Sequence, residues 1–272
     1  MLDKKIAFIG SGAMAEAMIS GLLKQNLAEP HHLLASDPRL ERVEELQQKY
    51  QVQPFTDNNQ AAKHADVVVL SVKPQRLTEV LSGLKSAVPP QALVLSIVTG
   101  ATIAKISNGL DHKAVVRSMP NTPAQIGEGM TVWTAKPEVS AGQKKLAGNI
   151  LGAMGKQLYV DDERYLDMAT AVSGSGPAYL FYFVESLVDA AIAIGWTREQ
   201  AKELVMATVL GAAQLLKQSG KEAADLRQAV TSKGGTTAAA LGVLEEGMFR
   251  ELVAKAIKAA HDRAIELGGG KR

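Results

Sequence analysis

The first half of the chain alternates short apolar runs with longer segments whose apolar residues recur at helical spacing. The runs cover residues 6–9, 32–36, 66–72, 92–98 and 114–118, and they are typical of strands buried on both faces of a sheet. Strands and helices in this alternation predict an α/β fold built on a doubly wound parallel sheet.

The pattern changes near residue 161. Two closing strands are expected just before it, at residues 130–134 and 157–160, and beyond it apolar residues recur only at helical spacing. The sequence therefore predicts an α/β domain over residues 1–160 and an all-α domain over residues 161–272.

The first strand runs directly into a glycine turn that opens a helix. Gly10, Gly12 and Ala15 follow the spacing G-x-G-x-x-A. Gly10 permits the turn, Gly12 lets a pyrophosphate approach the backbone, and the small Ala15 lets the helix pack close to the strand. The free N–H groups at the helix start suit phosphates. This pattern predicts a dinucleotide site, and an unliganded turn is the alternative.

The end of the second strand carries residues that distinguish NAD from NADP. Asp37 stands about 20 positions past the glycines, where an acidic residue holds the ribose hydroxyls in NAD sites. Ser36 and Arg39 beside it suit a 2′-phosphate, which marks NADP. The sequence leaves this choice open, and a plain turn residue before Pro38 is the alternative for Asp37.

A second glycine-rich segment, residues 231–237, lies in the helical half. Its two glycines and two threonines precede an alanine-rich helix and form a candidate anion cradle. It lacks the Lys-Ser/Thr pair of a nucleoside triphosphate loop. A substrate carboxylate suits it, and an ordinary helix cap is the alternative.

Composition and charge narrow the class of protein. The 272 residues include 30 basic and 28 acidic ones, a net charge of +2, with no basic run longer than a pair, so we expect no nucleic-acid partner. There is no cysteine for a disulfide, a thiolate nucleophile or a Cys-based metal site, and no metal is expected. Glu185 and Asp189 interrupt the most apolar helix, so we expect no membrane span and a cytoplasmic protein. The alanine-rich helical half predicts a homodimer formed through these helices.

Five segments together resemble the pyrroline-5-carboxylate reductases, which catalyse the last step of proline biosynthesis. They are FIGSGAMA at residues 8–15, SVKP at 71–74, MPNTP at 119–123, SGSGPAY at 173–179 and VTSKGGTTAAALGVLE at 230–245. The resemblance implies an oxidoreductase that uses NADPH, with NADH also accepted, to reduce the cyclic imine of 1-pyrroline-5-carboxylate to L-proline. It implies an N-terminal Rossmann domain, a helical dimerisation domain that also binds the substrate, and dimers that in this family often assemble by fives into a decamer.

The resemblance also implies roles for matching residues. Together with Ser36 and Arg39, the expected cofactor-binding residues are Gly10, Ser11, Gly12, Ala13, Met14, Ala15, Asp37, Asn58, Ser71, Val72, Lys73 and Pro74. The expected substrate-binding residues are Ser232, Gly234, Gly235, Thr236 and Thr237. Thr237 is expected to be catalytic, because its hydroxyl can hydrogen-bond the imine nitrogen and position the substrate for hydride transfer.

One position departs from the family. Many members that prefer NADPH have a hydroxyl residue where Asp37 stands, and a carboxylate there repels a 2′-phosphate unless Arg39 offsets it. We therefore expect use of both cofactors with a slight preference for NADPH. Two alternatives are a β-hydroxyacid dehydrogenase, which needs a lysine that residues 179–194 lack, and a catalytically silent dinucleotide-sensing protein. The sequence leaves open the dimer or decamer, feedback by proline, and other cyclic imines.

Overall fold

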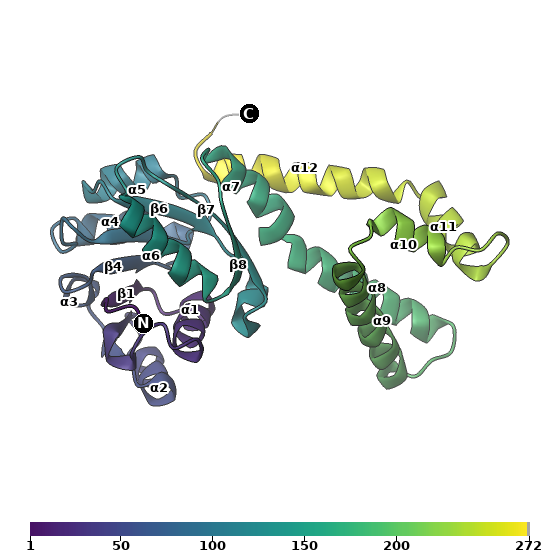
Figure 1. Ribbon diagram of the computed structural model, residues 1–272, viewed down its shortest axis with the longest axis horizontal. Helices are drawn as coiled ribbons and strands as arrows, with labels where there is room; N and C mark the ends of the chain where they lie inside the picture. Colours follow the sequence, from purple (N-terminus) through teal and green to yellow (C-terminus); the bar gives the residue numbers. More distant parts are fainter. Residues whose placement is uncertain (271–272) are drawn as a thin grey trace. The chain divides into compact units, whose positions relative to one another are not determined.

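The computed structural model of the chain describes residues 1–270, and its central sheet is built around the first strand. In order across the sheet (Figure 1), the eight strands are β3 (Gln53–Phe55), β2 (Leu33–Ser36), β1 (Ile6–Ile9), β4 (Val67–Leu70), β5 (Leu93–Ser96), β6 (Val115–Met119), β7 (Gly129–Ala135) and β8 (Gly155–Tyr159). The chain runs outward from β1 to β3 on one side and from β4 on the other. The carboxyl ends of β1 and β4 are therefore the point at which such sheets bind ligands.

The register explains why β1 is apolar throughout. Ile6 lies opposite Leu33 of β2 and Val67 of β4, both in parallel pairing, and all four residues of β1 are buried. Among the described residues, β6 and β7 form the one antiparallel pair, with Ser118 opposite Trp133. The chain returns there through the short 3₁₀ turn Thr122–Ile126, because an antiparallel pair needs no crossover helix. The predicted α/β class with a doubly wound sheet is confirmed.

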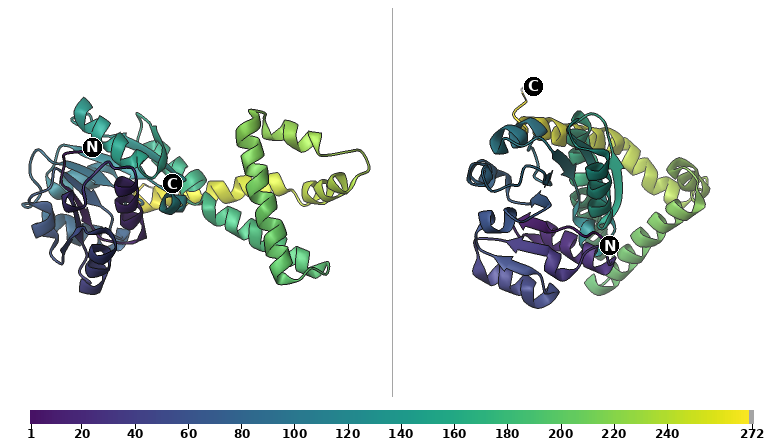
Figure 2. Two further views of the ribbon diagram at one scale, coloured as in Figure 1. Left: turned by 60° about the horizontal axis from the view of Figure 1, so that its bottom comes forward. Right: turned by 60° about the vertical axis from the view of Figure 1, so that its left-hand side comes forward.

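Helices cover both faces of this sheet (Figure 2). Alternate residues of β1 point to opposite faces, so Ile6 and Phe8 pack in one apolar cluster and Ala7 and Ile9 in the other. The first cluster is completed by α1 (Ala13–Lys24), α2 (Leu40–Tyr50) and α6 (Ala141–Gly152). The second is completed by α3 (Asn58–Ala62), α4 (Leu77–Leu84) and α5 (Ile103–Leu110).

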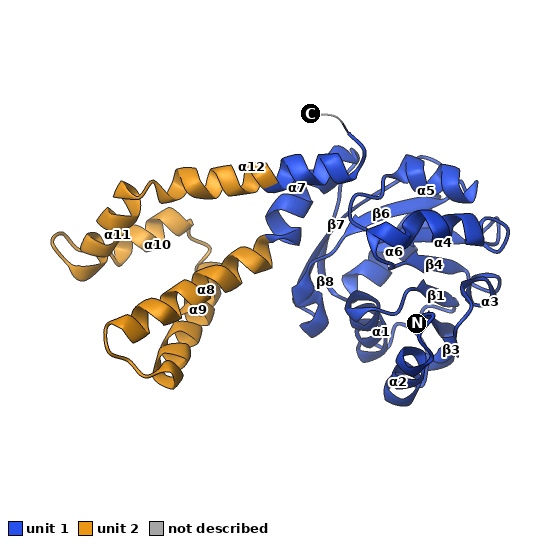
Figure 3. Ribbon diagram, turned by 180° about the vertical axis from the view of Figure 1, so that it is seen from behind, with its two compact units in different colours: residues 1–175, 260–272 blue, residues 176–259 orange. Residues whose placement is uncertain are grey.

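The chain divides into two compact units (Figure 3). Unit 1 holds residues 1–175 and the C-terminal segment from Ala260, and unit 2 holds Gly176–Ala259. Unit 1 thus includes α7 (Arg164–Ala169) and the π-helix Thr170–Gly174, and the π-helix ends with the first two residues of the SGSGPAY segment. The domain boundary at residue 160 remains a prediction.

Unit 2 is helical. Its helices are α8 (Gly176–Ala193), α9 (Arg198–Ser219), α10 (Ala223–Ala229), α11 (Thr236–Glu246) and the first part of α12 (Phe249–Leu267). Thr197 and Gln200 form a capping box at the start of α9, and Gly220 ends that helix with a positive φ of 64°. No strand follows β8 in the part of the chain that the structure describes, which agrees with the predicted helical second half.

Large apolar side chains remain exposed on unit 2, among them Phe181, Tyr182 and Leu252, whereas its buried apolar cluster is small and centres on Val188, Ala201 and Val205. Within residues 1–270, no helix is both long and apolar enough to cross a membrane.

Candidate functional site

A cavity of about 810 Å³ opens where the central strands of unit 1 end. Its walls come from the loops after β1, β2, β3 and β4 and from one side of α4. Of the predicted cofactor-binding residues, those that line the cavity are Gly10, Gly12, Asp37, Arg39, Asn58, Ser71, Val72 and Lys73. The structure thus brings residues from four separate segments of the sequence to one cavity.

Gly10 makes the turn after β1 in a conformation that other residues rarely adopt. Its φ is +93°, and a Cβ there would lie 2.8 Å from Val72 Cγ1 and 2.9 Å from the Ser71 carbonyl oxygen. The Gly10 N–H donates to the Ser36 carbonyl at 2.9 Å, and the Ser71 hydroxyl donates to the Gly10 carbonyl at 2.6 Å. The turn is therefore fixed between the ends of β2 and β4.

Gly12 is the N-cap of α1 and differs from Gly10 in having open space beside it. A Cβ on Gly12 would meet no atom within 4 Å, and its backbone is extended. No side chain caps α1, so the N–H groups of Ala13, Met14 and Ala15 lack helical acceptors. An open glycine beside an uncapped helix start fits a pyrophosphate group, so the residues present suit a bound dinucleotide.

Ser11 points inward and does not line the cavity. It is fully buried, and each of its polar atoms is engaged. Its N–H donates to Asp37 Oδ2 at 3.2 Å, its hydroxyl donates to the Ser36 carbonyl at 3.1 Å, and its carbonyl accepts from Arg42 Nε at 2.7 Å. These bonds hold the turn in place, and a direct contact between Ser11 and the cofactor remains a prediction.

Asp37 and Arg39 form an ion pair at the edge of the cavity. Asp37 Oδ1 accepts from the Arg39 N–H at 3.1 Å and from Arg39 Nε at 2.8 Å, and Oδ2 accepts from Arg39 Nη2 at 3.2 Å. Burial raises the pKa of Asp37, but the hydrogen bonds from Arg39 and Ser11 outweigh it, and the net pKa is lowered. Asp37 is thus an ionised, buried acceptor, and the Arg39 side chain is 66% exposed.

Ser36 and Asn58 are linked. Ser36 is buried, and its hydroxyl donates to Asn58 Oδ1 at 2.8 Å. Asn58 begins α3 and lines the cavity, next to Asp57, which caps that helix by accepting from the Asn59 N–H at 2.8 Å. The Ser36 hydroxyl therefore acts on the cavity through Asn58.

The loop after β4 closes the other side. Ser71, Val72 and Lys73 line the cavity, and Pro74 starts a 3₁₀ turn, Pro74–Arg76, without lining it. Residues of the lining that sequence reasoning missed include Thr56, Arg76, Glu79 and Val80. Arg76 and Val80 lie one helical turn apart at the start of α4, and no motif in the sequence marks either residue.

The predicted substrate segment lies in unit 2, where it joins α10 to α11 and includes the first two residues of α11. Gly234 has a φ of +73°, and the Gly235 N–H donates to the Ser232 carbonyl at 3.0 Å. A Cβ on Gly235 would lie 2.5 Å from Ser232 Oγ. Gly235 is the N-cap of α11 without a side-chain cap, so Thr236 and Thr237 stand on a helix start with free N–H groups.

The chain is similar in sequence to known proteins over nearly its whole length. Residues 163–267 match the family model described as pyrroline-5-carboxylate reductase dimerisation, and residues 5–100 match the model of coenzyme F420-dependent NADP oxidoreductases. The pyrroline-5-carboxylate reductase of Pseudomonas aeruginosa is 42% identical over 268 residues, 98% of each protein. That of Synechocystis is 39% identical over 264 residues, 97% of this chain and 98% of the relative. The chain belongs to the pyrroline-5-carboxylate reductase family.

Solved structures of pyrroline-5-carboxylate reductases have the same fold. The structure from Coxiella burnetii is 39% identical, covers 100% of both chains and has a TM-score of 0.90. The structure from Plasmodium falciparum with NADP bound is 31% identical, covers 98% of this chain and 99% of the other, and also has a TM-score of 0.90. The expected family and the Rossmann-plus-helical architecture are confirmed, the protein is an oxidoreductase, and the dimerisation model supports homo-oligomerisation.

Some of the predicted cofactor-binding residues lie outside the cavity lining. Among the predicted cofactor-binding residues, those that do not line it are Ser11, Ala13, Met14, Ala15, Ser36 and Pro74. Ala13, Met14 and Ala15 form the first turn of α1, whose N–H groups lack helical acceptors, and phosphate binding by these groups does not require their side chains to line the cavity.

Proposed function

We propose that this protein reduces the imine of 1-pyrroline-5-carboxylate to L-proline with NADPH, and also with NADH, as the last step of proline biosynthesis. The observation that carries the proposal is the cavity at Gly10 and Gly12, whose open backbone fits a dinucleotide in a chain of this family. When bound, the reduced nicotinamide supplies the hydride.

The cofactor is held, in this proposal, by residues of unit 1. The N–H groups of Gly12 and of Ala13–Ala15 bind the pyrophosphate, because the start of α1 has free donors and a positive dipole end. Asp37, Arg39 and Asn58 bind the adenosine ribose side, with Ser36 acting through Asn58. Ser71, Val72, Lys73 and Pro74 lie on the nicotinamide side, at the carboxyl end of β4.

The substrate is bound, in this proposal, by the segment before α11. Its carboxylate accepts from the free N–H groups of Thr236 and Thr237, with Ser232, Gly234 and Gly235 shaping the turn. The Thr237 hydroxyl donates a hydrogen bond to the ring nitrogen, which polarises the C=N bond and favours attack at carbon. Hydride adds to the imine carbon, the ring nitrogen takes up its protons from solvent, and Thr237 contributes mainly by positioning.

Preference between the two cofactors follows from the Asp37–Arg39 ion pair. The Arg39 guanidinium neutralises much of the charge of the Asp37 carboxylate, so that this carboxylate repels a 2′-phosphate less than an unpaired carboxylate would. The exposed face of Arg39 can then bind that phosphate, whereas Asp37 alone favours ribose hydroxyls. We therefore propose use of both cofactors, with a slight preference for NADPH.

The proposal also covers the oligomeric state, the domain bounds and the cellular location of the protein. The exposed apolar side chains of unit 2 support a homodimer through the C-terminal helices, with a decamer of five dimers as a further step. We propose a two-domain division at residues 1–160 and 161–272, and a cytoplasmic location, where reduced nicotinamide cofactors serve biosynthesis. Nucleic acid and membranes are not proposed as partners.

The test is the initial rate of 1-pyrroline-5-carboxylate reduction with NADPH and with NADH, in wild type and in Thr237→Ala. We expect turnover with both cofactors, and kcat lower by about 100-fold in Thr237→Ala with cofactor Kd unchanged. Thr208→Ala, at an exposed position of α9, is the matched control. Cofactor binding without turnover in the wild type would instead support the dinucleotide-sensing alternative.

A further inference from the structure

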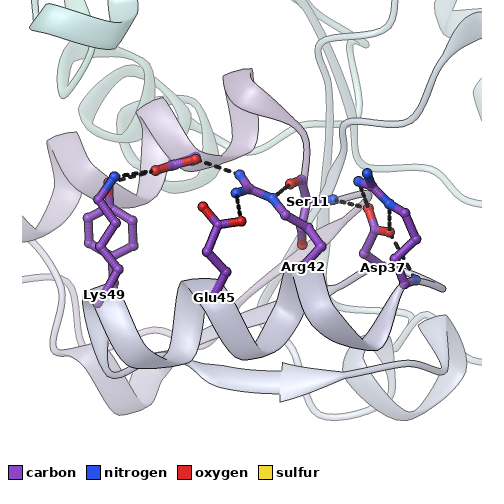
Figure 4. Close-up of polar contacts among 8 residues, drawn as sticks. Ser11, Asp37, Arg42, Glu45 and Lys49 are labelled. Carbon is purple, nitrogen blue, oxygen red and sulfur yellow. Dashed lines mark hydrogen bonds and ion pairs between the residues drawn. The ribbon is translucent and has the colours of Figure 1, made fainter.

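A group of charged and polar side chains joins α1 to α2 directly beside the glycine turn (Figure 4). We call it the α1–α2 cluster, and it consists of Glu16, Arg42, Glu45, Lys49 and Tyr50. Glu16 Oε2 accepts from Arg42 Nη2 at 2.5 Å, and Glu16 Oε1 accepts from Lys49 Nζ at 2.8 Å and from the Tyr50 hydroxyl at 3.0 Å. Arg42 Nη1 donates to Glu45 Oε2 at 2.6 Å.

Arg42 connects this cluster to the turn. Its Nε donates to the Ser11 carbonyl at 2.7 Å, so each of its three guanidinium nitrogens has a different acceptor. Its side chain is only 14% exposed and does not line the cavity. Arg39 lies three residues earlier, and its guanidinium donates to one carboxylate, that of Asp37. Its side chain is mostly exposed and lines the cavity. The two arginines therefore have different tasks.

The Ser11 carbonyl determines how the next N–H is oriented. In a trans peptide the C=O of Ser11 and the N–H of Gly12 point in opposite directions, and the described chain has no cis peptide. A guanidinium that holds the Ser11 oxygen thus fixes the Gly12 N–H on the side away from Arg42. The other two polar atoms of Ser11 are already held by Asp37 and Ser36, so Arg42 completes the set from the α2 side.

We propose that Arg42, oriented by Glu16, is a positioning residue for dinucleotide binding, which orients the Ser11–Gly12 peptide toward the pyrophosphate without touching the cofactor. The inference rests on the proposed function only in that a nicotinamide dinucleotide is the ligand. Because NADPH and NADH share the pyrophosphate, Arg42 affects both affinities equally, whereas Arg39 acts on the 2′-phosphate and affects NADPH selectively.

The charge state of the cluster is compatible with a permanent support. Burial raises the pKa of Glu16, but hydrogen bonds from Lys49, Arg42 and Tyr50 outweigh it and lower the pKa to about 2. Glu16 therefore remains ionised at every pH at which the enzyme is assayed. Tyr50 and Lys49 keep its carboxylate partnered when Arg42 is replaced, so an Arg42 variant leaves no unpaired buried charge.

The experiment measures Kd for NADPH and for NADH by direct fluorescence titration of the full-length protein, with thermal unfolding as a check of folding. Arg42→Met keeps the length of the side chain and removes its donors. We expect it to raise both Kd values by about tenfold, the loss of one charge-assisted hydrogen bond, with their ratio and kcat at saturating cofactor unchanged. Arg42→Lys keeps one donor and should restore part of the affinity. Glu45→Gln, which leaves the bond to Ser11 intact, is the matched control.

Arg39→Met is the comparator, and we expect it to raise Kd for NADPH at least fivefold more than Kd for NADH. Unchanged Kd values in Arg42→Met, a changed NADPH-to-NADH ratio, or a loss confined to kcat would each overturn the proposal. If Arg42→Met does not fold, Glu16→Gln tests the proposal in its place. We expect this variant to raise both Kd values by a smaller factor that is again equal for NADPH and NADH. Failure of wild-type turnover would count against the proposed reaction and leave the binding result valid.

Discussion

Two glycine turns open uncapped helices in this protein, one before α1 in unit 1 and one before α11 in unit 2, and they differ in what holds them. The turn at Gly10–Gly12 is bonded to the ends of β2 and β4 and to Arg42 of α2. Among the described residues, the hydrogen bond that holds the turn at Gly234–Gly235 is a local one, from the Gly235 N–H to the Ser232 carbonyl, and the residues of this turn are largely exposed.

A similar glycine pattern can therefore form a turn that is already rigid before a ligand binds, or a turn that the protein itself holds only weakly. The first turn has its donors aligned before any ligand arrives, so little ordering entropy remains to be lost on binding. The second turn is expected to gain rigidity from substrate and from homo-oligomerisation.

Gly10→Ala should have the largest effect. Its Cβ would overlap Val72 and the Ser71 carbonyl at a φ of +93°, so the turn must shift. We expect unfolding free energy to fall by about 2–3 kcal/mol. We also expect Kd for NADPH to rise about 100-fold, because the phosphate donors move. Calorimetry and fluorescence titration measure the two quantities, and wild-type stability would show that the turn is not held as described.

Gly12→Ala should separate binding from stability. Its Cβ meets no protein atom, so the free protein should lose less than about 1 kcal/mol. The methyl group would occupy the space that a pyrophosphate needs, and we expect Kd for NADPH and NADH to rise about 30-fold. Equal titration curves for the variant and the wild type would place the phosphates elsewhere.

Gly235→Ala tests the second turn. Its Cβ would lie 2.5 Å from Ser232 Oγ, a side-chain atom that can rotate away, so the turn can adapt. We expect KM for 1-pyrroline-5-carboxylate to rise about tenfold, with cofactor Kd unchanged. Steady-state kinetics and titration check this together. A variant that weakens the cofactor and spares the substrate would reverse the assignment of the two turns.

Much of the site could be predicted from the sequence because it is encoded locally. Gly10, Gly12 and Asp37 follow strand ends at fixed spacing, and each strand end is marked by an apolar run, so their convergence follows from the parallel sheet. The capping box at Thr197 is likewise a pattern within four residues.

The rest depends on contacts between distant residues. Arg42 meets Ser11 across 31 positions, and on α2 it is one polar residue among many. The inward direction of Ser11 and the link from Ser36 to Asn58 are also tertiary. Strand β3 has three residues and α3 has five, too few for a periodic pattern to develop.

The smallest expected effect is that of pH on the first turn. Its two supporting carboxylates have lowered pKa values, that of Glu16 to about 2 and that of Asp37 below its ordinary value. A lowered pKa stabilises the folded state above the ordinary pKa of about 4, and that stabilisation is lost as the pH falls through the folded value. Both groups are therefore ionised from pH 5.5 to 8.

Affinity for NADH should accordingly change by less than about twofold across that range. NADH is the suitable probe because it lacks the 2′-phosphate, which itself titrates near pH 6 in phosphate monoesters. Stability should fall only below about pH 4.5, and Glu16→Gln should flatten that decline, since the variant has no carboxylate to protonate. A steep loss of NADH affinity between pH 5.5 and 8 would mean that the turn depends on a group other than these two carboxylates. The turn at Gly10–Gly12 would then not be preorganised in the way described, and the contrast with the turn at Gly234–Gly235 would fail.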